Sequence, residues 1–378
     1  MIPDAVFAET LWQFLAPIRS LLDDPAVSDI CLNGHRRVFV ERAGRLELTE
    51  ARFETGEQLA SALRNLAQFV GKQVDAQRPI LEARLPDGSR VEAVLPPAAP
   101  DGPYVAIRKF PKQKLDVSRL VELGSLTPVC ARALEAIVRA KLNVIVAGGT
   151  GTGKTSMLNA LSAFIPHGER VIVIEDSKEV QLQRDHVVQL EARPADPKGR
   201  GEVTIRDLFR ATLRMRPDRI VVGEIRGGEA LEIIQAMTSG HGGCLATLHA
   251  TYPRDALTRL ETMSMMSNVD MPLAAMRIQI ASAVNVVVQV KRMGDGSRGI
   301  SHVSEVLGFD PARGIYVLQD LFVRRYERMT ARDDVRSELA YTGARPTFHG
   351  ALGEYGATWP SELGVSEASV VPAEDAGG

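Results

Sequence analysis

A run of glycines ending in a lysine and a threonine carries the clearest chemistry in the sequence. Residues 148–155 fit the pattern GxxxxGK[ST] and lie between an apolar run and a helical pattern. Glycines let successive backbone N–H groups surround a phosphate, and the following helix points its positive end at the same anion. Lys154 would bridge two phosphate oxygens, and the Thr155 hydroxyl would be a ligand for Mg²⁺. The motif predicts a nucleoside triphosphate site. The expected nucleotide contacts are Gly149, Thr150, Gly151, Thr152, Gly153, Lys154, Thr155 and Ser156.

An acidic residue at the end of a second apolar run would complete such a site. Residues 219–222 are Arg-Ile-Val-Val, and Gly223 and Glu224 follow. Open parallel sheets bind ligands at the carboxyl ends of their strands, so we expect Glu224 beside the phosphate loop. We assign Glu224 to polarising the attacking water and also expect it among the metal ligands. Gly223 stands where many enzymes with this loop carry a metal-binding aspartate, so another carboxylate must come from elsewhere.

A third apolar run, residues 171–174, ends in Glu175 and Asp176 and can supply that carboxylate. Mg²⁺ binds one or two carboxylates together with waters and phosphate oxygens. We therefore expect both residues in the nucleotide site and take Glu175 as a metal ligand, although the residues alone do not rank the two. The alternative is that one of them caps the segment that follows.

Two histidines bracket a fourth apolar run, residues 244–248. His241 precedes it in a glycine-rich turn, and His249 follows it. Their spacing does not fit a zinc site. We expect both imidazoles to reach the ligand edge of the sheet and to sense the γ-phosphate.

Basic residues gather in the first third of the chain, around two short alternating runs. They are Arg84, Arg90, Arg108 and Lys109. An arginine brought to a nucleotide from a second domain can neutralise charge on the transferring phosphoryl group. The alternative is a set of solvated strand edges, where basic side chains discourage aggregation. The residues alone leave both interpretations open.

The elements that position these residues change in kind along the chain. Short alternating runs separated by turn residues predict an α+β domain in the first third. Apolar strands then alternate with helices, which predicts an α/β domain with a parallel sheet covered on both faces. The expected parts are a helix at residues 1–25, the α+β domain at 26–112, a linker at 113–126, the α/β domain at 127–325, and a polar tail at 326–378 with a disordered end.

Composition sets the outer limits of this interpretation. The 378 residues suggest about two domains. A formal charge of -2 argues against a large basic face for nucleic acid, and an aromatic content of 5% is too low for a base-stacking platform. The 3 cysteines are far apart, which makes a disulfide framework improbable. No apolar stretch approaches the length of a membrane span.

Together the motifs resemble the four signature boxes of the type II/type IV secretion ATPases, in the order of that family. The boxes correspond to residues 148–155, 174–176, 213–226 and 238–249. Gly223 before Glu224 is the usual form in this family. Three further segments, at residues 202–208, 254–262 and 279–283, look like the CpaF/TadA branch, which powers tight-adherence (Flp, type IVb) pili.

This resemblance implies a RecA-like P-loop domain at residues 127–325 behind a smaller PAS-like α+β domain, with ATP and Mg²⁺ as ligands. It implies a homo-hexameric ATPase in the cytoplasm, peripheral to the inner membrane through a platform protein, without direct nucleic-acid contact. It also implies that Arg90 and Arg108 reach the phosphates and that Arg214 and Arg226 lie near a subunit interface. The alternatives are a VirB11-like ATPase of a conjugation or type IV secretion system, and a nucleic-acid translocase of the same fold.

Overall fold

The chain divides into two compact units, Met1–Lys114 and Leu115–Gly378. The computed structural model describes residues 4–42, 44–110, 115–182, 184–195, 199–326 and 337–364. Residues 113–114 of the predicted linker and residues 327–336 and 365–378 of the predicted tail lie outside this range.

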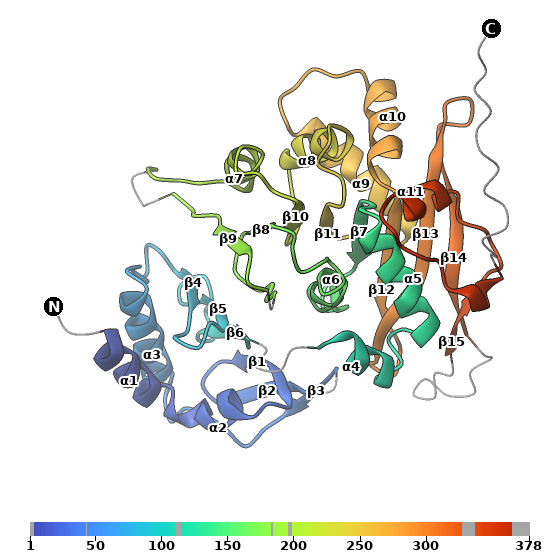
Figure 1. The fold of residues 1–378 in the computed structure, drawn as a ribbon. Helices are drawn as coiled ribbons and strands as arrows, with labels where there is room; N and C mark the ends of the chain where they lie inside the picture. The colour runs from blue at the N-terminus through green and yellow to red at the C-terminus, as the bar shows by residue number, and fades with distance from the viewer. Residues whose placement is uncertain are drawn as a thin grey trace, which may run out of the picture. The chain divides into compact units, whose positions relative to one another are not determined.

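The first unit is built on a six-stranded antiparallel sheet with helices packed against it (Figure 1). The strand order is β3-β2-β1-β6-β5-β4. The strands are β1 (Val27–Asn33), β2 (Arg37–Arg42), β3 (Arg45–Leu48), β4 (Ile80–Arg84), β5 (Arg90–Val94) and β6 (Tyr104–Arg108). The helices are α1 (Asp4–Phe14), η1 (Ala16–Ile18), α2 (Arg19–Asp23) and α3 (Gly56–Phe69).

The N-terminal helices belong to the core of this unit. The helix predicted at residues 1–25 is divided into shorter helices, and it packs against the α+β unit. A single α-helix does not continue, because Pro17 lacks an N–H and lies in the 3-10 turn η1. Leu11, Ile18 and Leu22 are fully buried with the apolar face of α3, so this segment is part of the α+β unit.

The second unit contains a nine-stranded sheet in the order β15-β14-β13-β12-β7-β11-β10-β8-β9. From β12 to β9 all neighbours are parallel, while β12 to β15 are joined antiparallel. The strands are β7 (Val144–Gly148), β8 (Val171–Glu175), β9 (Val187–Glu191), β10 (Arg219–Val222), β11 (Leu245–Leu248), β12 (Val286–Arg292), β13 (Arg298–Asp310), β14 (Ile315–Tyr326) and β15 (Ser337–Tyr341).

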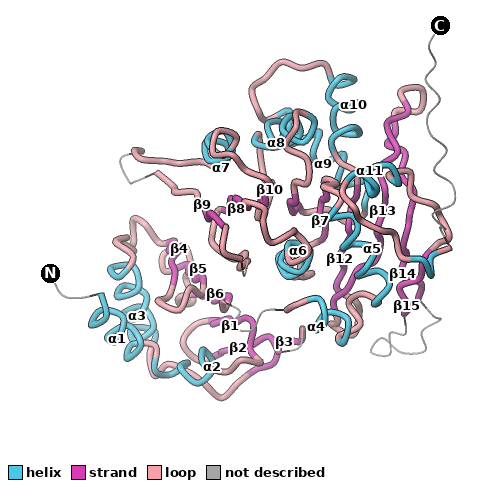
Figure 2. Tube along the Cα trace, in the orientation of Figure 1, coloured by secondary structure: helices cyan, strands magenta, loops and turns pink. Residues whose placement is uncertain are grey.

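Helices cover both faces of the parallel part of this sheet, as the sequence predicts (Figure 2). Successive side chains of β7 point to opposite faces, so Val144 and Val146 enter one core and Ile145 and Ala147 the other. The helices are α4 (Val117–Glu122), α5 (Pro128–Arg139), α6 (Lys154–Ser162), α7 (Ile205–Thr212), α8 (Glu229–Thr238), α9 (Pro253–Met265), α10 (Leu273–Ala283), α11 (His349–Glu354) and η2 (Ser361–Leu363). Among the described helices, none is long and apolar enough to cross a bilayer.

The segment predicted as a linker packs onto the second unit. Asp116 caps α4, and Leu120 and Leu126 are buried in the core that contains α5 and α6. The guanidinium of Arg324, on β14, donates to the carbonyl of Gly124 at 2.9 Å. Residues 115–126 are therefore part of the α/β unit and not a free connection.

The segment predicted as a polar tail also forms part of this unit. β15 pairs with β14, and Leu339, Leu352 and Trp359 are buried in the same core. The buried carboxylate of Glu305 accepts from the backbone N–H of Thr347 at 2.9 Å. The apolar residues of this segment are too widely spaced to produce a helical or strand period, and so the sequence pattern missed them.

Candidate active site

The phosphate loop joins the end of β7 to the start of α6. Gly153 precedes the helix with φ 91°, a left-handed conformation that glycine adopts without strain. The Thr152 hydroxyl donates to the Gly149 carbonyl at 2.9 Å and closes the loop on itself. Lys154 is only 8% exposed, and its ammonium donates to the same carbonyl at 3.0 Å. The other predicted nucleotide contacts are exposed or half-buried in the loop and the first turn of α6, namely Gly149, Thr150, Gly151, Thr155 and Ser156.

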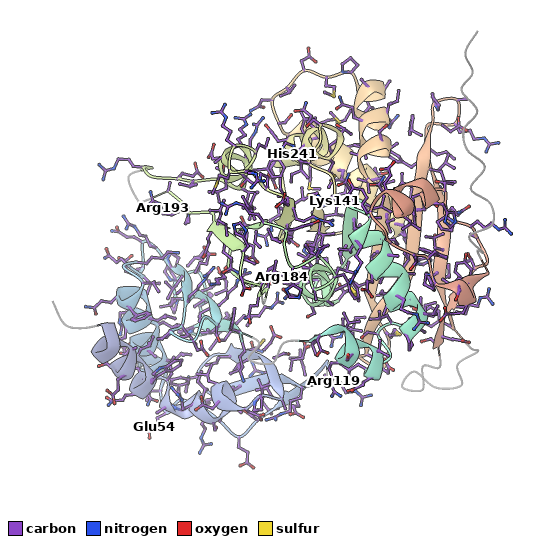
Figure 3. All side chains as sticks on the ribbon, in the orientation of Figure 1. Glu54, Arg119, Lys141, Arg184, Arg193 and His241 are labelled. Atoms are coloured by element: carbon purple, nitrogen blue, oxygen red, sulfur yellow. The ribbon has the colours of Figure 1, made fainter. Side chains whose placement is uncertain are left out.

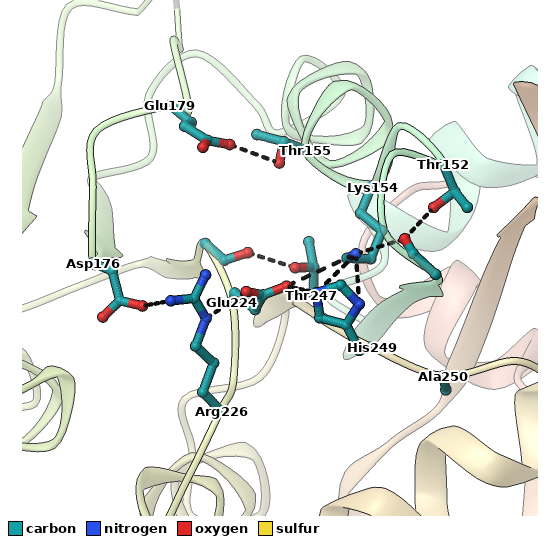
Figure 4. Close-up of polar contacts among 12 residues, drawn as sticks. Thr152, Lys154, Thr155, Asp176, Glu179, Glu224, Arg226, Thr247, His249 and Ala250 are labelled. Carbon is teal, nitrogen blue, oxygen red and sulfur yellow. Dashed lines mark hydrogen bonds and ion pairs between the residues drawn. The ribbon is translucent and has the colours of Figure 1, made fainter. Parts of the chain in front are cut away.

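Glu224 follows β10 and lies beside Lys154 (Figure 4). Its Oε1 is 3.8 Å from the Lys154 ammonium and 2.9 Å from Nε2 of His249, which follows β11. The parallel strands β7, β10 and β11 thus bring a cation, a carboxylate and an imidazole to one edge of the sheet. The Glu224 side chain is 16% exposed, so a water molecule can still approach it.

The imidazole of His249 is a neutral partner in this group. Both of its ring nitrogens lie 3.4 Å from the Lys154 ammonium. Burial lowers the pKa of His249, and the positive charge of Lys154 lowers it further. At neutral pH the ring is therefore uncharged, and the tautomer with its proton on Nε2 donates to Glu224.

Glu175 is buried below the nucleotide edge and is not placed as a metal ligand. It is 3% exposed, and its Oε1 accepts from the backbone N–H groups of Glu179 and Val180 at 2.9 and 2.8 Å. Burial raises its pKa to about 7. A Cβ on Gly223 would approach the Glu175 Cγ to 2.8 Å. Glu175 thus caps the segment that follows β8, which is the alternative the sequence left open, and it accounts for a glycine at position 223.

Asp176 and Glu179 face different partners. An oxygen of Asp176 lies 2.6 Å from the Arg226 guanidinium, while the Thr155 hydroxyl donates to Glu179 at 3.1 Å (Figure 4). Sequence reasoning missed Glu179, although it belongs to the same acidic segment. Glu179 lies four residues beyond the end of β8, so its position in the sequence does not suggest that it is near the phosphate loop. The turn that Glu175 stabilises brings it back to that loop.

The pair formed by Thr155 and Glu179 suits Mg²⁺. A hydroxyl and a carboxylate are hard oxygen donors, and Mg²⁺ completes its shell with phosphate oxygens and waters. Among the residues that the structure describes, no cluster of three or more His, Cys, Asp or Glu side chains is arranged to hold a metal. Thr155 and Glu179 would supply two of the oxygen ligands of Mg²⁺, and phosphate oxygens and waters would supply the rest.

His241 lies at the other edge of the sheet, contrary to the prediction that both histidines reach the ligand edge. It precedes β11, whereas His249 follows it. His241 lies near α8 (Figure 3). Its backbone N–H donates to the Ala236 carbonyl near the end of that helix. A strand separates the two histidines, so a parallel sheet holds them at opposite ends.

The predicted arginines of the first unit form a row across its sheet. Arg108 on β6 is paired in register with Arg90 on β5, and Arg90 with Arg84 on β4. Paired residues on neighbouring strands share a face, so the three side chains lie side by side. Asp29 on β1 lies 3.3 Å from the Arg108 guanidinium. The row is a concentrated positive patch within that unit.

A family model described as "Type II/IV secretion system protein" matches residues 13–302. The chain belongs to this family. The family model, the phosphate loop of residues 148–155 and Glu224 beside Lys154 together make it an ATPase.

Two relatives and one solved structure are similar to this chain. A putative conjugal transfer protein of Mycobacterium tuberculosis is 33% identical over 293 residues, covering 76% of this chain and 83% of that protein. The type IV secretion system protein PtlH of Bordetella pertussis is 34% identical over 298 residues, covering 72% of this chain and 88% of PtlH. The structure of the Legionella pneumophila ATPase DotB has a TM-score of 0.55 at 22% identity, over 76% of this chain and 79% of that one, and shows the same fold.

These similarities establish the type II/IV secretion family but do not establish a branch within it. Both relatives carry names from conjugal transfer or type IV secretion. They do not single out the CpaF/TadA branch that three sequence segments suggested.

Proposed function

We propose that the chain is the MgATP-driven motor of a conjugation or type IV secretion system. The observation that carries the proposal is the single carboxylate of Glu224, held beside the buried ammonium of Lys154 and the neutral ring of His249. The names of the relatives supply the setting.

We assign a task to each residue of the site. Lys154 binds the terminal phosphates, and the N-terminus of α6 adds its positive end. Thr155 and Glu179 would hold Mg²⁺, and the bound ion would neutralise charge on the phosphate oxygens. Glu224 orients and polarises the attacking water. His249 holds the Glu224 carboxylate by a hydrogen bond and presents its ring to the γ-phosphate.

The arginine row of the first unit completes this proposal. Arg90 and Arg108 are suited to neutralise charge on the phosphates of a nucleotide. Arg108 would exchange its contact with Asp29 for a phosphate oxygen.

The proposed working form is a homo-hexameric ring in the cytoplasm, peripheral to the inner membrane. A platform protein in the membrane would receive the domain movement, and the ring would need no contact with nucleic acid. Binding energy drives such a movement only through different affinities of the open and closed states for ATP.

A motor of tight-adherence pili is the second candidate. It is favoured by the three CpaF/TadA-like segments at residues 202–208, 254–262 and 279–283. Both candidates use the same fold and the same hydrolysis site, so only the partner machine separates them.

Deletion of the gene in its host, followed by complementation, tests the proposal. DNA transfer or protein secretion should be lost, while surface pilin remains at the wild-type level. The wild-type chain and Glu54→Gln, an exposed carboxylate in the first unit, should restore transport, and Glu224→Gln should not. Loss of surface pilin with intact transport would establish the pilus candidate instead. Normal levels of both would contradict both candidates.

A further inference from the structure

We propose that Asp176 is a positioning residue for ATP hydrolysis that acts on Glu224 through Arg226. The inference rests on the proposed role of Glu224 in polarising water. It differs from the sequence-based expectation that Asp176 touches the nucleotide or its metal.

The Arg226 guanidinium bridges two carboxylates that come from neighbouring strands (Figure 4). Its Nε lies 2.5 Å from Oε2 of Glu224, and its Nη1 lies 2.6 Å from Oδ2 of Asp176. The planar fork of an arginine can meet both carboxylates with fixed directions, which a lysine cannot. The end of β8 is thereby tied to the end of β10.

Arg226 contacts the carboxylate oxygen of Glu224 that does not face the phosphate loop. Oε1 of Glu224 faces His249 and Lys154, whereas Oε2 faces Arg226. With partners on both oxygens, the plane of the carboxylate is fixed. A fixed plane matters because a carboxylate that rotates presents its lone pairs to water in the wrong direction.

Arg226 needs a second contact, besides the one with Glu224, in order to hold the carboxylate of Glu224 in place. Its backbone N–H is fixed by the carboxylate of Glu229 at 2.7 Å, but its side chain is 56% exposed. A long exposed side chain samples many rotamers unless a second contact selects one. Asp176 makes that contact, and its own position is set because it directly follows β8, which pairs in parallel with β10.

The acidic residues after β8 have different partners, which agrees with a positioning role for Asp176. Glu179 contacts Thr155, the hydroxyl expected at the metal, whereas Asp176 contacts a cation of the protein. A carboxylate held 2.6 Å from a guanidinium is already neutralised and has little need of a second cation.

Steady-state kinetics of Asp176→Asn, Arg226→Gln and the double variant test the inference. Asp176→Asn should lower kcat about fivefold to tenfold, the size expected for one charge-assisted contact, while KM for ATP and the Mg²⁺ requirement stay within about twofold. The double variant should be no slower than Arg226→Gln alone, because Asp176 acts only through Arg226. Asp176→Glu, which keeps the charge, should recover most of the rate.

Three outcomes would overturn the inference. These are an unchanged kcat in Asp176→Asn, a higher Mg²⁺ requirement in that variant, or rate losses that multiply in the double variant. Thermal melting of each variant shows that the fold is kept, and if Asp176→Asn does not fold, Asp176→Ala, alone and combined with Arg226→Gln, provides the same comparison. Glu224→Gln is measured alongside, since wild-type turnover there would refute the proposed role of Glu224 itself and not the bridge alone.

Discussion

The two edges of the parallel sheet carry similar residues and use them differently. At the carboxyl edge, Lys154, Glu224 and His249 form a group that solvent can reach. At the amino edge, Arg219 begins β10 with a side chain that is 0% exposed, and its Nε lies 2.5 Å from a carboxylate oxygen of Glu169. Both edges contain a cation paired with an acid, but only the first lies where an anion can enter.

The connections of the chain account for this difference. After β7 the chain turns through exposed glycines into the N-terminus of α6, which leaves backbone N–H groups facing outward. Before β7 and β11 the backbone is closed by the buried side chain of Asn143. Its amide donates to the carbonyl of Ala283 at 2.7 Å and accepts from the N–H of Cys244 at 3.0 Å. The contacts at the amino edge therefore stabilise the fold.

The largest expected effect is that of Glu224→Gln at the carboxyl edge. The amide keeps the shape of the side chain but cannot polarise water as a carboxylate does. Turnover should fall about a hundredfold to ten-thousandfold while ATP affinity is retained. Phosphate release gives the rate, and titration with a fluorescent ATP analogue gives the affinity. Turnover at the wild-type rate would remove Glu224 from the mechanism.

The two histidines offer a matched comparison of the edges. His249→Ala removes a contact of Glu224 and should lower kcat about tenfold, equivalent to about 1.4 kcal/mol in the barrier. His241 lies at the opposite edge of the sheet, so His241→Ala should leave kcat within about twofold of the wild-type value. If both variants lost the same activity, the assignment of His241 to the structural edge would be wrong.

A glycine at the amino edge should affect stability and not chemistry. A Cβ at Gly243 would lie 2.3 Å from Nη1 of Arg219, and the residue has φ +79°. Gly243→Ala should therefore lower the free energy of unfolding by about 2–4 kcal/mol, with normal kcat for the folded protein. Gly240→Ala is the control, since it has φ +91° with open space around it and should lose only about 1 kcal/mol. Urea unfolding followed by circular dichroism measures both, and equal losses would contradict the clash.

Local pattern was sufficient to predict much of the fold and part of the site. The apolar runs of strands such as β7 and β8 alternate with helices, and this order predicts a parallel sheet with a ligand site at its carboxyl edge. Lys154, Thr155 and Glu224 lie next to such strands, and the structure places them at that edge.

Longer-range contacts could not be predicted in this way. The burial of Glu175 depends on its packing against Gly223, and the pairing of Asp176 depends on Arg226, about 50 residues away in sequence. The C-terminal segment joins the sheet through β15 and through contacts such as Thr347 with Glu305, and both depend on partners that are distant in the sequence. His241 and His249 look equivalent in the sequence until the direction of β11 is known.

Nucleotide affinity of two lysine variants tests the central claim most directly, namely that ATP binds at the carboxyl edge. Lys154 lies at that edge, and Lys141 lies at the amino edge, 3.7 Å from Glu169 (Figure 3). Isothermal titration with a non-hydrolysable ATP analogue should show affinity about a hundredfold weaker for Lys154→Ala, and wild-type affinity for Lys141→Ala. Wild-type affinity in Lys154→Ala, or equal weakening in both variants, would contradict the account.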